Sequence, residues 1–386
     1  MRTGEDNEVA MNGVHSITAH AGRSGVVLPW SADSRRLRVT FVLPIDHSII
    51  LHGGLQIQVA ETAAALRRLG VEVRMFDPLT NDLGDVVHMF GCCGYFWEVA
   101  RIAMARGVPF CFSPVFSSGK QGPDLSLSAV WKKFIKSYPW DQQRLLRHAH
   151  RVFTLSAMEE ENLQRFFGVD GGSFVRVPNG VSPGMTGSAE TFRAACGVRE
   201  PFILKVASFY RNKRQKMLIE LANRTGRHAV FIGGAFDASY MEECRRIAGP
   251  TVHILGEIPY GSPLIAGAYE AARVFCLTSR REVMSLAAIE AAKAGLPMVL
   301  GDRWGAREYF SDDALYVSPD NAAQLEAAID TQWQEPASRR EQRREKYRGR
   351  FTWQETARRF RTEYESIRPE SHGTIAQFQG LRRSAG

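Results

Sequence analysis

The stretch VFCLTSRREVMSLAAIEAAKAGLPMVLGD (274–302) contains one complete strand–helix–strand unit. Its ends, VFCLTS (274–279) and PMVLGD (297–302), are short apolar runs of the length and composition expected for buried strands. Between them a helix is expected to begin near Ser285 and to end at Gly295 and Pro297. Strands that alternate with helices in this way are typical of a parallel sheet that is covered on both faces.

The same alternation extends through most of the chain in both directions. The expected strands of the first half are 37–44, 71–77, 85–91, 108–114, 151–156 and 174–180, and those of the second half are 202–208, 229–234, 252–258, 274–279, 297–302 and 314–319. The segment 182–200, which contains Gly, Ser and Pro, interrupts the rhythm and is expected to hold the interdomain linker.

These patterns predict two doubly wound α/β domains of the Rossmann type that face each other across a cleft. The predicted parts are a disordered extension over 1–36, a first domain over 37–183, a second domain over 184–350, a closing helix over 351–368 and a flexible tail over 369–386. Ligands of such sheets lie at the carboxyl ends of the strands, so the functional residues are expected in the loops that follow them.

The composition excludes several classes of protein. Hydrophobic residues make up 44% of the 386 residues, yet no apolar run approaches the roughly 20 residues that a membrane-spanning helix needs. The six cysteines form no C-x-x-C pair and the N-terminus has no apolar signal segment, which favours free thiols and a cytoplasmic location. The net charge is +8 without a recognised nucleic-acid motif, so an anionic lipid surface is a better expected partner than nucleic acid.

Several chemistries lack their sequence signals. The chain has neither G-x-G-x-x-G nor G-x-x-x-x-G-K-[ST], which argues against a dinucleotide oxidoreductase and a P-loop nucleotidase. It also has neither D-x-D nor H-E-x-x-H, so no metal and no tightly bound cofactor are expected.

Three strand-to-helix junctions carry residues suited to a phosphorylated sugar. The helix that begins near Ser285 offers free backbone N–H groups for a phosphate, and Glu282 and Glu290 could accept hydrogen bonds from sugar hydroxyls. Arg211 and Lys216 follow the strand at 202–208 and could bind a diphosphate. Each of these patterns also fits a bland alternative, namely an Ala-rich buried helix with two exposed glutamates or a solvated basic loop.

The third junction is the pair Gly53 and Gly54, which opens the helix expected over 55–70. Two residues without a Cβ would let the backbone approach a ligand phosphate closely. A tight turn explains the same pair equally well.

Taken together, these motifs resemble those of retaining glycosyltransferases of family 4, which have the two-domain GT-B fold. Glu282 and Glu290 match the Glu-x7-Glu motif of that family, and Arg211 and Lys216 match its Arg-x4-Lys diphosphate clamp. The loop HGG (52–54), the segment NGV (179–181), WGARE (304–308) and a closing helix that starts FTWQETA match further family segments. The resemblance extends from Leu37 to Ile367.

The resemblance implies a metal-independent enzyme that transfers a hexose from a nucleotide diphosphate sugar to a hydroxyl of a glycan or lipid-linked acceptor, in the synthesis of surface polysaccharides or glycoconjugates. It implies that Arg211 and Lys216 bind the leaving diphosphate, that Glu282 holds the sugar and that Glu290 holds the ribose. The backbone amides of Val283, Met284 and Ser285 would approach the donor. The closing helix would pack back on the first domain.

The sequence departs from the family pattern at three places. Val283, Met284 and Ser285 replace Gly-Phe-Gly, Met217 replaces the glycine after the clamp lysine, and Ser113-Pro114-Val115 stands where many members carry a histidine. These departures leave open a non-catalytic, nucleotide-sugar-binding subunit with the same fold. An epimerase or a dehydrogenase is a third alternative, although the missing glycine fingerprint counts against it.

The segment 127–147 has a pattern of its own. Trp131, Phe134 and Trp140 alternate there with lysines at 132, 133 and 136, which suits a segment that lies in a lipid headgroup layer. We therefore expect a peripheral association with the inner face of the membrane as the alternative to a fully cytoplasmic enzyme. An aromatic stripe in the protein core gives the same spacing.

Overall fold

The computed structural model describes residues 36–44, 53–80, 82–117, 138–182, 187–302 and 305–369. The predicted extension, except for residue 36, and the predicted tail, except for residue 369, lie outside the described residues.

The first half of the chain forms a six-stranded sheet whose strand pairs are all parallel. The strand order is β2-β1-β3-β4-β5-β6. The strands are β1 (Arg38–Val42), β2 (Glu72–Met75), β3 (Val86–Phe90), β4 (Phe110–Ser113), β5 (Arg151–Thr154) and β6 (Phe174–Arg176). The helices between them are α2 (Gly54–Arg68), α3 (Phe96–Ala105), α5 (Tyr138–His148) and α6 (Ala157–Phe167).

The second half forms another parallel sheet of six strands, in the order β12-β11-β10-β7-β8-β9. Its strands are β7 (Phe202–Val206), β8 (His228–Ile232), β9 (Val252–Gly256), β10 (Val274–Leu277), β11 (Met298–Gly301) and β12 (Ala314–Val317). Its helices are α7 (Ala189–Cys196), α8 (Gln215–Thr225), α9 (Ala238–Ile247), α10 (Pro263–Ala271), α11 (Leu286–Lys293), α12 (Ala306–Phe310), α13 (Ala322–Trp333) and α14 (Ala337–Tyr347). The predicted fold class, with two doubly wound α/β domains, is confirmed.

Each sheet has one point where its strand order reverses. The first chain half passes from β1 to β2 on one side and resumes with β3 on the other side of β1. In the second half, β7, β8 and β9 follow one another before β10 pairs with the free side of β7. Ligands of open α/β sheets bind beyond the strand ends at such points, so the loops after β7 and β10 are the first place to look for a site.

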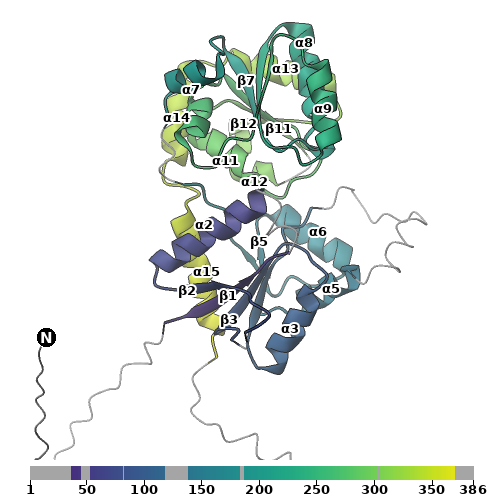
Figure 1. Cartoon of the computed structure of the whole chain (residues 1–386), viewed down its shortest axis with the longest axis vertical. Coiled ribbons are helices and arrows are strands. Elements are labelled where there is room, and N and C mark those ends of the chain that lie inside the picture. Colours follow the sequence, from purple (N-terminus) through teal and green to yellow (C-terminus); the bar gives the residue numbers. More distant parts are fainter. Residues whose placement is uncertain are drawn as a thin grey trace, which may run out of the picture. The chain divides into compact units, whose positions relative to one another are not determined.

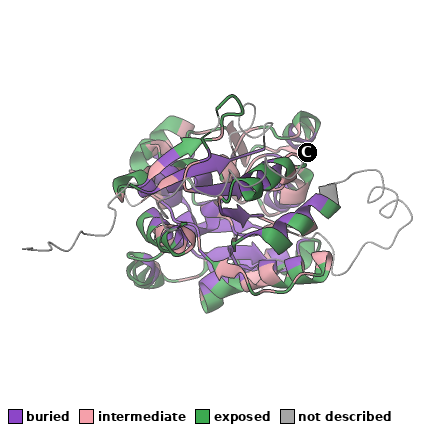
Figure 2. Cartoon of the chain, turned by 90° about the horizontal axis from the view of Figure 1, so that it is seen from below, coloured by how far each residue is buried: buried purple, intermediate pink, exposed green. Residues whose placement is uncertain are grey.

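The central strands of both sheets are buried, the edge strands β2, β6 and β9 are only partly so, and the helices that cover the sheets expose one side (Figure 2). For example, β3 has no exposed residue, in keeping with a strand covered on both faces. All six cysteines are free, as expected; three are buried and three are only half-buried.

The last helix, α15 (Trp353–Ile367), returns to the first sheet and lies beside α2 (Figure 1). Its buried side chains join the core that covers β1 and β3, and the Phe360 ring lies 4.7 Å from the Phe153 ring between centroids. Tyr364 on the same helix shares a hydrogen bond of 2.5 Å between its hydroxyl and Nδ1 of the buried His88.

Gly180 explains why the chain can pass so close to the start of α15. A Cβ at this position would lie 2.1 Å from the backbone nitrogen of Trp353, a distance at which the two backbones would clash. The absence of a side chain therefore permits the contact in which Val181 N donates to the carbonyl oxygen of Phe351 at 2.9 Å.

Candidate active site

The loops that follow β7 and β10 meet through a lysine and a glutamate. Lys213 Nζ contacts Glu282 Oε1, and Ser279 Oγ donates to the same carboxylate oxygen at 3.0 Å. Asn212 joins the loops a second time, because its carbonyl accepts from Arg280 N at 2.9 Å and its side-chain amide donates to the carbonyl of Arg281 at 2.8 Å. The strand ends at the reversal point of the second sheet thus hold a fixed, partly buried charge pair.

The helix that follows this loop begins as predicted. Ser285 is the N-cap of α11, and its hydroxyl accepts from Ala288 N at 3.4 Å. The side chains of Val283 and Met284 are buried in the core of the second domain. The helix N-terminus that follows them has free backbone N–H groups, which attract an anion.

Glu290, on α11, is buried with a side-chain partner. Its Oε2 accepts a hydrogen bond of 2.5 Å from the hydroxyl of Tyr269 on α10. Burial raises the pKa of Glu290 to about 7, and the hydrogen bond from Tyr269 opposes this shift. A carboxyl group that titrates near neutral pH is a common feature of binding and catalytic sites.

Arg211 and Lys216 lie on the side of α9 rather than against Glu282. Both pair with Glu243: Arg211 Nη2 lies 3.0 Å from Oε2, and Lys216 Nζ lies 2.9 Å from Oε1. The Arg211 guanidinium also covers the ring of Tyr240, at 5.1 Å from its centroid. The hydrogen bond from Lys216 lowers the pKa of Glu243, which therefore stays negatively charged and offsets the positive charges of Arg211 and Lys216.

Lys213 was not among the residues that the sequence motifs singled out. Two features of the structure distinguish it from Lys216. It contacts Glu282, and the next residue, Arg214, has a φ of 58°, the left-handed conformation that favours glycine. Met217, by contrast, lies within α8. The family pattern has a glycine after its clamp lysine, so Lys213 fits that pattern in conformation whereas Lys216 fits it only in spacing.

With Lys213 in the lysine position, the residue at the arginine position of the motif is Ser208. The signal in the sequence was present but ambiguous, because RNKRQK (211–216) contains several cations and only one arginine–lysine pair has the expected spacing.

The glycine pair lies in the first domain, at the start of α2. Gly53 is the N-cap, and its N–H donates to Gln56 Oε1 at 2.9 Å. A Cβ at Gly54 would meet no atom within 4 Å, so the space beside this residue is open. His52, the remaining member of the HGG motif, lies outside the described residues.

The loop after β4, where many family members carry a histidine, has a strained backbone. Val115 has a φ of 49°, which is uncommon for a β-branched residue. Ser113 Oγ lies 2.8 Å from Nε2 of His88 and is buried with it. Ser113 is therefore engaged in the core of the first domain.

Glu308, which ends the WGARE segment, receives two backbone N–H groups at the start of α6. Its oxygens accept from Ala157 N at 2.8 Å and from Met158 N at 3.1 Å. Arg176 Nη1 lies 3.7 Å from the same carboxylate. A carboxylate at a helix N-terminus is stabilised by the helix dipole, so this contact is favourable.

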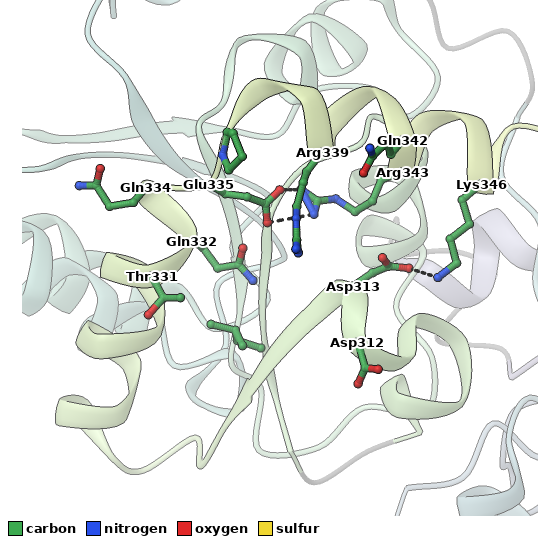
Figure 3. A pocket seen from close by; sticks show the side chains of 12 residues that line it. Asp312, Asp313, Thr331, Gln332, Gln334, Glu335, Arg339, Gln342, Arg343 and Lys346 are labelled. Atoms are coloured by element: carbon green, nitrogen blue, oxygen red, sulfur yellow. Dashed lines mark hydrogen bonds and ion pairs between the residues drawn. The ribbon is translucent and has the colours of Figure 1, made fainter.

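A cavity of about 620 Å³ lies elsewhere in the second domain, beside α13 and α14 (Figure 3). Its charged side chains are largely paired with one another, as in the pair between Arg343 and Glu335 and that between Lys346 and Asp313. None of the predicted site residues lines it. Within the described residues, no group of three or more His, Cys, Asp or Glu side chains could hold a metal ion.

Two family models match separate parts of the chain. Residues 84–180 match the model of a glycosyl transferase 4-like domain, and residues 190–349 match that of glycosyl transferases group 1. No curated protein sequence gives a significant match.

Solved structures show the same fold at low sequence identity. A sucrose-phosphate synthase from Thermosynechococcus elongatus is 19% identical, with a TM-score of 0.69 over 86% of this chain and 99% of the other. HepE from Anabaena, solved in complex with UDP-glucose, is 17% identical, with a TM-score of 0.67 over 86% and 100%. A glycosyltransferase from Rickettsia africae is 15% identical, with a TM-score of 0.66 over 86% and 99%. With a glycosyl transferase 4-like domain in its first half and a group 1 domain in its second, the chain has the two-domain architecture of a GT-B glycosyltransferase.

Proposed function

We propose that the protein is a metal-independent, retaining hexosyltransferase of family 4. It would move a hexose from a nucleotide diphosphate sugar to a hydroxyl of a glycan or lipid-linked acceptor, in polysaccharide or glycoconjugate synthesis. The observation that carries the proposal is the arrangement at the reversal point of the second sheet, where Lys213, Glu282 and the N-terminus of α11 lie next to one another. The complex of HepE with UDP-glucose supports a nucleotide sugar as the donor.

The proposed roles follow from charge. The leaving diphosphate gains negative charge as its bond to the sugar breaks, and the ammonium of Lys213 and the N–H groups at the start of α11 would stabilise that charge. Arg211 and Lys216 would add positive potential once the phosphate competes with Glu243 for them. Because these side chains supply the cations, no metal ion is required in this mechanism.

The two glutamates would position the rest of the donor. Glu282 would accept hydrogen bonds from the sugar hydroxyls, and Glu290 would accept them from the ribose. Gly53 and Gly54 would let the start of α2 approach the donor phosphate. For retention, the acceptor attacks on the face that the leaving group vacates, and the departing phosphate oxygen takes the acceptor proton. This scheme needs no protein base at Ser113-Pro114-Val115, where many family members carry a histidine.

A thermal-shift screen with UDP, GDP, ADP and their sugars tests the proposal. At 100 times its Kd, the correct nucleotide should raise the Tm by roughly 5 °C, and the shift and the turnover should persist in excess EDTA. No shift with any nucleotide would contradict the proposal, and loss of turnover on chelation would contradict the metal-independent mechanism. A shift without turnover in the presence of a range of glycan acceptors would favour the non-catalytic subunit, which the missing histidine keeps open.

Donor affinity is expected to depend on pH through Glu290. The pKa of this carboxyl group is raised to about 7 in the ligand-free protein, whereas hydrogen bonds from ribose hydroxyls favour its charged form. Donor binding should therefore strengthen as the pH rises through 7, with an affinity about 10-fold lower at pH 6 than at pH 8. Titration calorimetry at pH 6 and pH 8 measures the donor affinity. The neutral variant Glu290→Gln should bind more weakly at pH 8 and show no such dependence; an equal pH dependence in both proteins would contradict the assignment.

We also propose contact with an anionic membrane surface through the segment 127–147. Trp140, at the start of α5, is 53% exposed, as such a role requires. Trp131, Phe134 and lysines 132, 133 and 136 lie outside the described residues. None of the described helices is long and apolar enough to cross a membrane. Flotation with anionic liposomes at low salt, abolished by high salt or by changing the three lysines to glutamate, is the expected result, and no flotation would contradict it.

A further inference from the structure

A buried lysine without a partner lies in the strand that leads to the proposed donor site. Lys205 is the fourth residue of β7, a strand that otherwise reads FILV, and it is only 1% exposed. Its Nζ has no hydrogen-bond partner among the described residues. Such a group is costly to bury, so its presence in a strand position that an aliphatic side chain could fill calls for a reason.

The position of Lys205 relates it directly to the charge pair. β7 and β10 run side by side in parallel, with Ile203 opposite Val274 and Leu204 opposite Phe275. β7 continues into the loop of Lys213, and β10 continues through Ser279 to Glu282. Lys205 therefore lies beneath the point where the two loops meet.

The ionisable groups around Lys205 come from four elements. They are Cys276 on β10, Lys213 and Arg214 before α8, Glu282 after β10, and Cys244 on α9. Glu282 is the carboxylate of this set, and it is already paired with Lys213.

Three buried oxygens beyond the carboxyl ends of the same two strands are also without hydrogen-bond partners among the described residues. They are Asn212 Oδ1, Gln215 Oε1 and Thr278 Oγ1, which follow β7 and β10 at their carboxyl ends. An ammonium group has only donors, and these oxygens can accept. Polar acceptors as well as charged groups therefore lie at the carboxyl ends of β7 and β10.

We propose that Lys205 is a positioning residue for sugar transfer: its buried ammonium holds the Glu282 carboxylate in place while the donor diphosphate occupies Lys213. The inference rests on the proposed function. When Lys213 pairs with the diphosphate, Glu282 loses the ion-pair partner that it has in the ligand-free protein. The carboxylate then faces the negatively charged phosphates, and like charges repel one another. Lys205 supplies a second positive charge without touching the substrate.

The proposal has a signature in pH. Burial lowers the pKa of Lys205 to about 8; Lys213 and Arg214 lower it further, whereas Cys276 and Glu282 raise it. Turnover should therefore fall as the pH rises through about 8 and the charge is lost. Stability should change in the opposite sense. The unfolded chain keeps the lysine protonated to a higher pH, so it binds more protons above pH 8 and the folded state gains stability there as the pH rises.

The test is Lys205→Met, which replaces the ammonium by an apolar side chain of similar length. The donor is the nucleotide sugar that gives the largest thermal shift with the wild-type protein, and the assay measures release of its nucleoside diphosphate. We expect the variant to have a higher Tm at pH 7 and a kcat/KM about 10-fold lower, of the order found when groups that orient a ligand are removed. The fall of turnover near pH 8, which is the alkaline limb of the pH profile, should be absent.

Lys293→Met is the matched control. Lys293 is a half-buried lysine of α11 whose Nζ donates to the carbonyl of Arg350 at 3.1 Å. This variant should lose stability and keep both turnover and the alkaline limb. A wild-type protein that turns over donor without an alkaline limb, or a Lys205→Met variant with unchanged turnover, would overturn the role of Lys205. A parallel loss of Tm and activity would show a structural role only. A wild-type protein without nucleotide binding would instead overturn the proposed function.

Discussion

Lys213→Ala is expected to lower kcat by about 10²–10³-fold, as the loss of one preorganised charge donor at a developing anion typically does. Lys213 contacts Glu282 at the reversal point of the second sheet, and its side chain is 23% exposed, so its charge is only partly screened by water. It lies in a short turn before α8 and outside the hydrophobic core, so the fold should survive. Steady-state kinetics with the donor found in the nucleotide screen, together with the Tm, measure both effects.

Arg211→Ala and Lys216→Ala are the matched comparisons. Both cations are exposed to solvent and already paired with Glu243, so we expect each change to lower kcat by about 10-fold or less. The opposite result would be a 10²–10³-fold lower kcat in these two variants and a kcat within a few-fold of wild type in Lys213→Ala. It would mean that Arg211 and Lys216, which match the motif in spacing, form the diphosphate clamp, and that Lys213 does not.

Phe360→Ala is expected to reduce the free energy of unfolding by about 3–5 kcal/mol, the usual cost of truncating a buried aromatic side chain. Phe360 is 1% exposed and packs edge-on against Phe153 of β5, with His88 and Tyr364 also in ring contact. The cavity would open between α15 and the first sheet. Urea denaturation followed by circular dichroism measures the loss.

Arg359→Ala is the control on the same helix. Arg359 is about half-exposed and makes only an exposed pair with Glu355, at 3.0 Å, so its removal should cost about 0.5 kcal/mol or less. Equal losses in the two variants would mean that α15 is held by its surface charges rather than by its apolar face.

The strands could be predicted from the sequence because each is a short apolar run between helical segments. All twelve expected strands are present, and the closing helix expected over 351–368 corresponds to α15. The order of the strands could not be obtained in this way. Placing β3 beside β1, and β10 beside β7, depends on contacts between residues far apart in the chain, which local periodicity does not record.

The places of the candidate site residues along the fold could be predicted, but their side-chain pairing could not. Glu282 lies in the loop after β10 and Ser285 at the start of α11, as the strand–helix pattern predicts. The sequence could not show that Glu243, on a different helix, pairs with both Arg211 and Lys216, because such pairing depends on how α8 and α9 pack. Nor could it show the left-handed backbone of Arg214, which a residue other than glycine adopts only rarely.

The return of α15 to the first sheet affects how the protein folds on the ribosome. The core over β1 and β3 is completed by Trp353, Phe360 and Tyr364, which are synthesised after the whole second domain. The first domain therefore emerges early with an apolar face that no later segment has yet covered, whereas the second sheet is contiguous in the chain. During translation, the second domain can reach its native state before α15, the last helix of the first domain, has been synthesised. That interval is when the nascent chain most needs a chaperone.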